Sequence, residues 1–280
     1  MQLTNDQLRC FSEQGHLVVR GLFSRAEVER YRDHFMRLRA AGTYEFDQVA
    51  DKPVEGDPLK RFPRMIHMHR WDEPSRRWLL EPRLAACLAA LMGTEPLAVQ
   101  SMVYFKPPGA RGQALHQDQY YLNVKPGTCV AAWLALDPAD ERNGCMRVVP
   151  ASHTWPVLCA RKADPTTSFT DTTVELPSDQ EVRPVVMDEG DVLFFNGLLV
   201  HGSLPNATLD RFRRSLIGHY IPCTASEVTA FDQPLLRMDG TELWLKAAAF
   251  GGPCGQWVDR DGAKVLEVSG VNATPTWTHE

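Results

Sequence analysis

The chain has 280 residues, of which 44% are hydrophobic and 23% are charged, as is typical of a soluble globular protein. Its formal net charge of -5 argues against a nucleic acid as the main partner, because phosphate binding requires a basic surface. No apolar run approaches the roughly 20 residues that span a bilayer, so we expect no membrane partner. The N-terminus lacks the basic-then-apolar pattern of a secretory signal, and we predict a cytoplasmic protein.

The cysteines are scattered along the chain and none forms a CxxC pair, so a structural zinc site is not expected. A disulfide framework is also not expected in a chain of this length in a reducing compartment. We therefore predict reduced, mostly buried thiols. They are Cys10, Cys87, Cys129, Cys145, Cys159, Cys223 and Cys254.

The first 95 residues combine helical patterns with one apolar strand. Ser24 followed by Glu27 has the spacing of a capping box, which marks the start of a helix. The polar segment 43–63 is rich in Asp, Pro and Gly, which is typical of a loop. The predicted elements are a helix to Phe11 capped by Thr4, a strand at 16–23, a helix from 25 to about Ala41, and a helical stretch over 75–92 that ends at Gly93.

From residue 96 onward the pattern changes to short apolar runs separated by Gly, Pro, Asn and Asp. About eight strands of this length predict a mainly β protein with a jelly roll or a related double-sheet barrel. A further hairpin is predicted in the tail, with its turn at Asp261-Gly262. The predicted strands are 97–106, 113–118, 128–136, 145–149, 182–187, 191–196, 199–203 and 211–221.

We expect one domain over 1–280. Its helical N-terminal part, 1–95, packs outside a β-barrel core, 96–222, and residues 223–280 form a C-terminal extension or lid. Lids are expected at 43–63 and after residue 222.

The motif His116-Gln117-Asp118 carries the candidate chemistry. On a strand, residues i and i+2 point to the same face, so His116 and Asp118 can bind one metal while Gln117 points elsewhere. His201, beyond a separate strand, is the best candidate for a third ligand. Two histidines and one carboxylate on one face of a metal are typical of non-haem Fe(II) oxygenases. Because HxD alone is common by chance, the prediction rests on the combination.

An arginine after His201 strengthens this interpretation. In the strand 211–221, Arg213, Ser215, Ile217 and His219 share one face by parity. An inward arginine near a metal needs an anionic partner, and the distal carboxylate of 2-oxoglutarate would serve as one. Parity alone does not separate Arg213 from Arg211.

Several segments in order resemble the phytanoyl-CoA dioxygenase family of Fe(II)- and 2-oxoglutarate-dependent oxygenases. The resemblance covers roughly residues 4–222. The segments are KPPG at 106–109, LHQDQYYL at 115–122, AAWLALD at 131–137, NGCMRVVPASH at 143–153, GDVLFFNGLLVHGSLPN at 190–206 and RRSLIGHY at 213–220.

The resemblance implies a double-stranded β-helix, a cupin-like jelly roll, in which His116, Asp118 and His201 bind Fe(II). It implies that Arg213, rather than Arg211, binds the distal carboxylate of 2-oxoglutarate. Further cosubstrate contacts are implied for Ser203, Met102, Gln117 and Trp133. The cofactors are then Fe(II), 2-oxoglutarate and O2, with ascorbate as a candidate reductant.

The resemblance also implies hydroxylation of a small-molecule metabolite with release of succinate and CO2. Family members that halogenate have a small residue in place of the carboxylate ligand, so Asp118 favours hydroxylation. Some relatives carry a basic cosubstrate contact upstream of the second helix, and here either His67, His69 or neither takes that role. The candidates for a substrate pocket are Tyr104, Tyr120, Tyr121, Asn123 and Phe195.

Three alternatives stay open. The first is a cupin-like metal enzyme that does not use 2-oxoglutarate, against which Arg213 and Ser203 count. The second is a binding module that has lost catalysis, against which the intact ligand set counts. The third is a protein hydroxylase, although no peptide groove can be read from the sequence.

Overall fold

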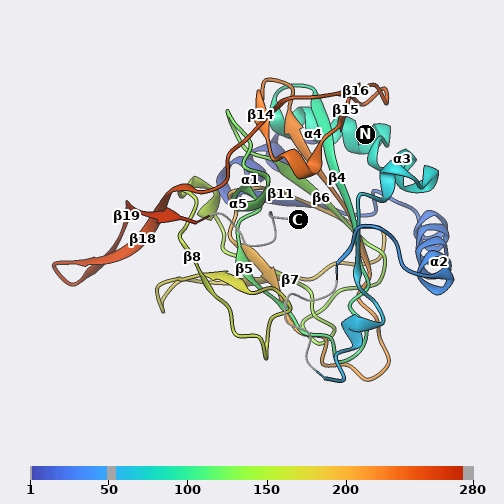
Figure 1. Ribbon diagram of the computed structural model, residues 1–280, viewed down its shortest axis with the longest axis horizontal. Helices are drawn as coiled ribbons and strands as arrows, with labels where there is room; N and C mark the ends of the chain where they lie inside the picture. Colours follow the sequence, from blue (N-terminus) through green and yellow to red (C-terminus); the bar gives the residue numbers. More distant parts are fainter. Residues whose placement is uncertain (1, 49–54, 274–280) are drawn as a thin grey trace.

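The computed structural model describes residues 2–48 and 55–273 (Figure 1). Helix α1 (Asn5–Gln14) begins at Thr4, whose side chain accepts a hydrogen bond from the backbone of Gln7, and ends at Gly15 in a left-handed conformation. Helix α2 (Arg25–Ala41) begins with the predicted capping box of Ser24 and Glu27. Both predicted helices are confirmed, and α1 continues three residues beyond Phe11.

The single helical stretch predicted over 75–92 is wrong. The structure has two helices there, α3 (Glu73–Leu79) and α4 (Pro82–Met92). Pro82 lacks a backbone N–H and disfavours a helical conformation in the preceding residue. Glu81 accordingly has φ -58° and ψ 123°, which ends α3 and lets a new helix start at Pro82. Gly93 ends α4 as predicted.

The strands form two main sheets. The larger sheet has the path β1-β11-β6-β13-β4-β15-β16, and the smaller one has the order β10-β7-β12-β5. Strands are present at all eight positions predicted between residues 97 and 221. The bounds are β1 (His16–Val19), β4 (Pro96–Tyr104), β5 (Gln113–His116), β6 (Val130–Ala135), β7 (Met146–Val148), β10 (Arg183–Val185), β11 (Val192–Asn196), β12 (His201–Ser203), β13 (Ser215–Pro222), β15 (Leu235–Leu236) and β16 (Glu242–Leu243).

Both faces of the larger sheet are covered. Successive side chains on a strand point to opposite faces. One set packs in a core with residues of the four helices, which therefore cover the outside of the sheet, as predicted. The other set packs against the smaller sheet, so the two sheets face each other. Outward residues include Val103, Leu134 and Leu216, and inward residues include Met102, Trp133 and Ile217.

The shorter elements surround these sheets. Part of the predicted loop 43–63 forms β2, which pairs with β3, and residues 49–54 of that loop lie outside the described residues. The bounds are β2 (Asp47–Gln48), η1 (Pro58–Lys60), β3 (Arg64–Ile66), η2 (Met68–Arg70), α5 (Gln119–Leu122), η3 (Ser152–Thr154), β8 (Ala160–Lys162), β9 (Thr172–Val174), β14 (Glu227–Val228), η4 (Ala230–Asp232) and β17 (Lys246–Ala247).

The predicted C-terminal hairpin is confirmed. It consists of β18 (Gly252–Arg260) and β19 (Ala263–Asn272), and it projects away from the two sheets (Figure 1). Asp261 and Gly262 at its turn both have positive φ, 51° and 82°, as a tight two-residue hairpin turn requires.

The prediction that every cysteine is a reduced thiol is wrong for one pair. Cys159 and Cys254 form a disulfide across 95 residues of sequence. They meet because Leu158 bridges to Gly255 and the Cys159 N–H donates to the Gly255 carbonyl, which brings β18 against the segment before β8. Such a long-range contact leaves no spacing signal in the sequence. Among the described residues, no helix is long and apolar enough to cross a bilayer.

Candidate active site

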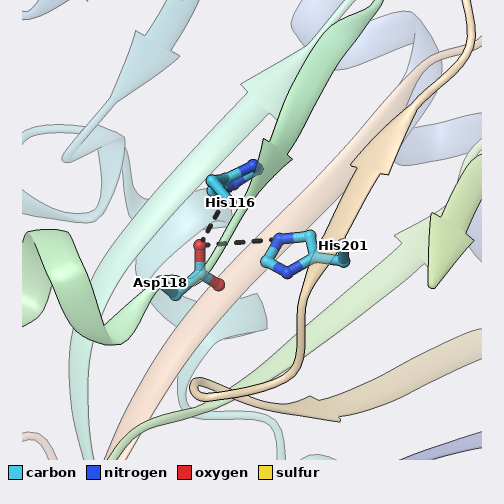
Figure 2. Close-up of side chains that lie close together, drawn as sticks. All are labelled: His116, Asp118 and His201. Atoms are coloured by element: carbon cyan, nitrogen blue, oxygen red, sulfur yellow. Dashed lines mark ion pairs between the residues drawn. The ribbon is translucent and has the colours of Figure 1, made fainter. Parts of the chain in front are cut away.

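Three side chains converge between the two sheets (Figure 2). His116 and His201 are register partners on the antiparallel strands β5 and β12, and Asp118 follows β5 directly. Oδ1 of Asp118 lies 3.5 Å from Nε2 of His116 and 3.6 Å from Nε2 of His201. The ligand atoms of the three residues all lie within 4.8 Å of one another, and all three residues are buried. The predicted cluster therefore forms with one donor atom per residue.

The backbone sets the direction of both imidazoles. Nδ1 of His116 lies 2.9 Å from the carbonyl oxygen of Ala114, and Nδ1 of His201 lies 2.9 Å from that of Leu199. A carbonyl only accepts, so Nδ1–H is the donor in each ring and each Nε2 carries the lone pair that can bind a metal. In the structure Nε2 of His116 lies 3.2 Å from the amide nitrogen of Gln113, which a metal would replace as its partner. This arrangement of a ligand and its supporting hydrogen bond is the usual one in metal sites.

The charges in the cluster suit a divalent cation. Burial lowers the pKa of His201 to about 4, so this imidazole is neutral at pH 7. Burial alone would raise the pKa of Asp118, but the neighbouring His201 and His219 hold it well below its ordinary value. Two imidazoles and one carboxylate form a ligand set that fits Fe(II).

The sequence analysis gave no role to His219, which contacts Asp118. Nε2 of His219 lies 3.1 Å from Oδ2 of Asp118. A hydrogen bond therefore also fixes this second carboxylate oxygen, which does not face His116 or His201. His219 and Ile217 lie on the inward face of β13, and Arg213 lies just before this strand. Parity predicted that the three share one face, and all three line the same cavity.

Arg213 is buried without a carboxylate partner among the described residues. Its Nε donates to the carbonyl of Gly144 across 3.0 Å, and one Nη donates to Oγ of Ser215 across 3.0 Å. The guanidinium carbon lies 5.1 Å from the centre of the Trp133 ring. Burial lowers the pKa of Arg213 to about 10, so it remains charged at pH 7. A buried cation that lines a cavity calls for an anionic ligand. Arg211, by contrast, pairs with Asp140 in a part-exposed ion pair.

Met102, Trp133 and Ser203 were also predicted to contact 2-oxoglutarate. Met102 and Trp133 line the same cavity as Arg213. Oγ of Ser203 accepts hydrogen bonds from Nζ of Lys106 at 2.8 Å and from the backbone of Gln113 at 3.2 Å, which leaves the serine O–H free to donate.

Gln117 departs from its predicted role as a cosubstrate contact. Its amide nitrogen donates to the carbonyls of Pro156 and Leu198, and its amide oxygen accepts from the backbone of Leu158. It follows β5 directly, does not line the cavity, and ties the segment that carries His116 and Asp118 to neighbouring loops.

The cavity has a volume of about 330 Å³ and contains all three candidate metal ligands. Of the aromatic candidates, Tyr104, Tyr121 and Phe195 line it, whereas Tyr120 and Asn123 do not. Both predicted lid regions contribute. Gln48 comes from the segment 43–63, and Thr229, Phe231 and Asp232 come from the tail after residue 222.

Neither His67 nor His69 lines the cavity, although both are buried close to it. Nδ1 of His69 lies 2.8 Å from Oγ of Ser101. The basic residue of that region that does line the cavity is Arg64. Parity along β3 (Arg64–Ile66), with Ile66 also lining the cavity, is the signal that would have found it.

Comparison with known proteins agrees with this geometry. The family model described as "Phytanoyl-CoA dioxygenase (PhyH)" matches residues 11–215. A mouse protein named "Phytanoyl-CoA dioxygenase, peroxisomal" is 27% identical over 272 residues, covering 89% of this chain and 78% of its own length. A rice protein named "Phytanoyl-CoA dioxygenase 1" is 28% identical, covering 73% and 84% of the two chains.

Solved structures show the same fold. The non-heme alpha ketoglutarate dependent epimerase SnoN from nogalamycin biosynthesis has a TM-score of 0.63 at 22% identity, with 79% of this chain and 83% of that chain covered. EctD from S. alaskensis, solved with 2-oxoglutarate and 5-hydroxyectoine, has a TM-score of 0.61 at 22% identity, with 79% and 76% covered. The predicted cupin-like jelly roll is therefore confirmed.

Proposed function

Because this chain belongs to the phytanoyl-CoA dioxygenase family of 2-oxoglutarate-dependent dioxygenases, we propose that it hydroxylates a small-molecule metabolite with release of succinate and CO2. One observation carries the proposal. Three side chains that could hold a metal ion and a buried arginine without a carboxylate partner among the described residues share one cavity. His116, Asp118 and His201 would bind Fe(II), and Arg213 would bind the distal carboxylate of 2-oxoglutarate.

The iron, when bound with 2-oxoglutarate, supplies the activation of O2 that the protein's own side chains lack. The protein's own residues hold the metal-facing imidazoles and the guanidinium in place. The carbonyls of Ala114 and Leu199 fix the two imidazoles, and Arg213 is held by Gly144 and Ser215 so that its remaining N–H groups are presented to a carboxylate. Met102 and Trp133 supply apolar surface, and we propose Ser203 as an additional hydrogen-bond donor.

We propose that residues 1–280 act as one oxygenase unit, in which the helical part supports the barrel and the C-terminal extension completes the cavity. The contribution of Thr229, Phe231 and Asp232 to the cavity wall supports this organisation. The cytoplasmic location stays a prediction.

A cupin-like enzyme that does not use 2-oxoglutarate would have no use for Arg213, which is the observation against that alternative. The test is succinate formation by the purified chain supplied with Fe(II), 2-oxoglutarate, O2 and ascorbate. We expect slow iron-dependent turnover without substrate and faster turnover with substrates identified by screening. Asp118→Ala should abolish it, whereas Asp140→Ala, far from the cavity, should not. Unchanged succinate formation in Asp118→Ala would refute the ligand assignment.

A further inference from the structure

One part of the cavity wall comes from the segment around η4 (Ala230–Asp232), through Thr229, Phe231 and Asp232. These residues lie beyond residues 11–215, which the family model matches. Arg70 holds the backbone of this segment, because its Nη2 donates to the carbonyls of Phe231 and Gln233 at 3.1 Å each. The three side chains are therefore presented to the cavity from a fixed position.

Asp232 brings a carboxylate to this wall without a cationic partner. It is 2% exposed, and its Oδ1 accepts a hydrogen bond from Nε2 of Gln100 at 2.8 Å. Among the described residues, no lysine or arginine forms an ion pair with Asp232, and no hydrogen bond reaches its Oδ2. Because an ionised carboxylate in a buried site is costly unless it is paired, this group is matched to a ligand that carries hydrogen-bond donors.

The nearest titratable neighbour does not neutralise Asp232. Nε2 of His67 lies 3.4 Å from Oδ1 of Asp232. Burial lowers the pKa of His67 to about 2, so its ring is neutral at physiological pH. Burial also raises the pKa of Asp232 to about 7, although His219, the hydrogen bond from Gln100 and the more distant Arg70 act in the opposite direction.

Thr229 gives an independent sign of a ligand. It is 2% exposed and lines the cavity, and its Oγ1 is buried with no hydrogen-bond partner among the described residues. Buried hydroxyls nearly always have a partner in a folded protein, so this hydroxyl retains hydrogen-bonding capacity for a molecule bound at the cavity. Thr229 and Asp232 thus place two polar groups without complete partners in the wall of one cavity.

Phe231 adds an aromatic surface beside the carboxylate. Its ring packs against His67 and Phe46, with centroids 4.9 Å and 6.1 Å away, and it also lines the cavity. An aromatic face next to a carboxylate is a common arrangement for binding an ammonium group, which both groups attract. A neutral hydroxyl would gain only from the carboxylate.

We propose that Asp232, Thr229 and Phe231 form a subsite that binds a protonated amine of the substrate. This inference rests on the proposed function and specifies its substrate class as small organic amines. The cavity then has two charged ends of opposite sign. Arg213 receives the dicarboxylate and repels an ammonium group, while Asp232 receives the amine. His219, which contacts the ligand Asp118 and lines the cavity with Asp232, lies close to both the metal cluster and this subsite.

The test compares two probes that differ in one group, benzylamine and benzyl alcohol. The full chain is loaded with Fe(II) and 2-oxoglutarate without oxygen, and loading is verified by the charge-transfer absorption of the loaded site. Binding of each probe is then measured by ligand-observed NMR titration. We expect wild-type protein to bind benzylamine about tenfold or more tightly than benzyl alcohol, since loss of a buried charge pair weakens binding strongly.

Four variants test whether the preference for the amine depends on this subsite. Asp232→Asn keeps the shape of the side chain and should reduce the preference to within about twofold, whereas Asp239→Asn, at an exposed turn, should leave it unchanged. Asp171→Asn removes the other carboxylate that lines the cavity outside the metal cluster, and it should retain most of the preference. Thr229→Val should weaken benzylamine binding while the folded protein still loads iron.

The inference would be overturned if loaded wild-type protein bound benzylamine no more tightly than benzyl alcohol. It would also be overturned if the preference for benzylamine survived in Asp232→Asn, or if it disappeared in Asp171→Asn instead. A chain that fails to load iron and 2-oxoglutarate would refute the proposed function itself, so the two failures are distinguishable.

Discussion

His219 donates a hydrogen bond from Nε2 to Oδ2 of Asp118 across 3.1 Å, while Oδ1 of the same carboxylate faces His116 and His201. The carboxylate only accepts when ionised, so the proton lies on His219. One oxygen is thereby fixed and the other is directed to the metal cluster. Nδ1 of His219 has no partner among the described residues, so the contact with Asp118 is what orients the ring.

We expect His219→Ala to weaken Fe(II) binding by about 10- to 100-fold, which is the usual effect of removing a group that orients a metal ligand. His219→Gln places an amide N–H near the position of Nε2 and should restore much of the affinity. Anaerobic metal titration gives both values. If the alanine variant binds Fe(II) as tightly as wild type, then Asp118 is oriented by other contacts and this role for His219 is wrong.

Replacement of Arg213 separates cosubstrate binding from metal binding. Arg213→Gln removes the charge, and since a hydrogen bond to a charged group contributes about 1.5–3 kcal/mol, the Kd for 2-oxoglutarate should rise at least tenfold. Binding of Fe(II) alone should change little. Arg211→Gln is the matched control, because Arg211 pairs with Asp140 away from the cavity. Equal losses in the two variants would contradict the assignment of the cosubstrate to Arg213.

Acid should destabilise the protein partly through His69. Burial lowers its folded pKa to about 3, below the ordinary value of 6.5 that applies when the chain unfolds. The unfolded state therefore takes up the proton first, and stability falls as the pH drops from 6.5 toward 3. Each pH unit in this window removes about 1.4 kcal/mol from the free energy of unfolding.

The variant that checks this prediction is His69→Asn, which keeps a polar atom near the position of Nδ1 beside Ser101 and removes the titration. Between pH 7 and pH 5, wild type should lose about 2 kcal/mol more stability than the variant, as measured by urea unfolding. Asp232 has a raised folded pKa and acts in the opposite direction, but its effect is common to both proteins and cancels in the comparison. Equal pH dependence in wild type and His69→Asn would contradict the prediction.

The proximity of His116 to Asp118 and the inward position of Arg213 could be predicted because their signals are local. The HxD spacing and the alternation along residues 213–219 are properties of a few consecutive residues, whereas His201 had to be chosen from a separate strand. Capping boxes at Thr4 and Ser24 and the turn at Asp261-Gly262 are local in the same way. Each was recovered in the structure.

The features that the sequence did not predict depend on distant contacts. Asp232 reaches the cavity from a tail with no regular pattern, and only the fold reveals that no lysine or arginine of the described residues forms an ion pair with it. Gln117 bonds to loop backbone instead of taking the role that the family resemblance implied. The boundary between α3 and α4 could have been predicted, because proline in a first helical turn marks the start of a helix. The apolar spacing on either side of Pro82 instead favoured one continuous helix.

The disulfide between Cys159 and Cys254 should stabilise the attachment of the β18–β19 hairpin. Asn272 adds hydrogen bonds to the backbone of Ala160 and Leu158, so the attachment combines one covalent and two polar contacts. The double variant Cys159→Ser/Cys254→Ser should lose about 2–4 kcal/mol in the free energy of unfolding. Metal affinity should change less than twofold, because β5 and β12 hold the ligands without the hairpin.

The matched control is Cys10→Ser/Cys223→Ser, which replaces two exposed free cysteines and should leave stability unchanged. Treatment with dithiothreitol should bring wild type to the unfolding midpoint of the Cys159→Ser/Cys254→Ser variant and leave that variant unaffected. If dithiothreitol does not shift the wild-type midpoint, the bond contributes nothing to stability. Thiol titration of protein extracted under acid quench reports whether the bond forms in cells. If Cys159 and Cys254 are fully reduced in cells, this would agree with the predicted cytoplasmic location, because a reducing compartment keeps cysteines in the thiol form.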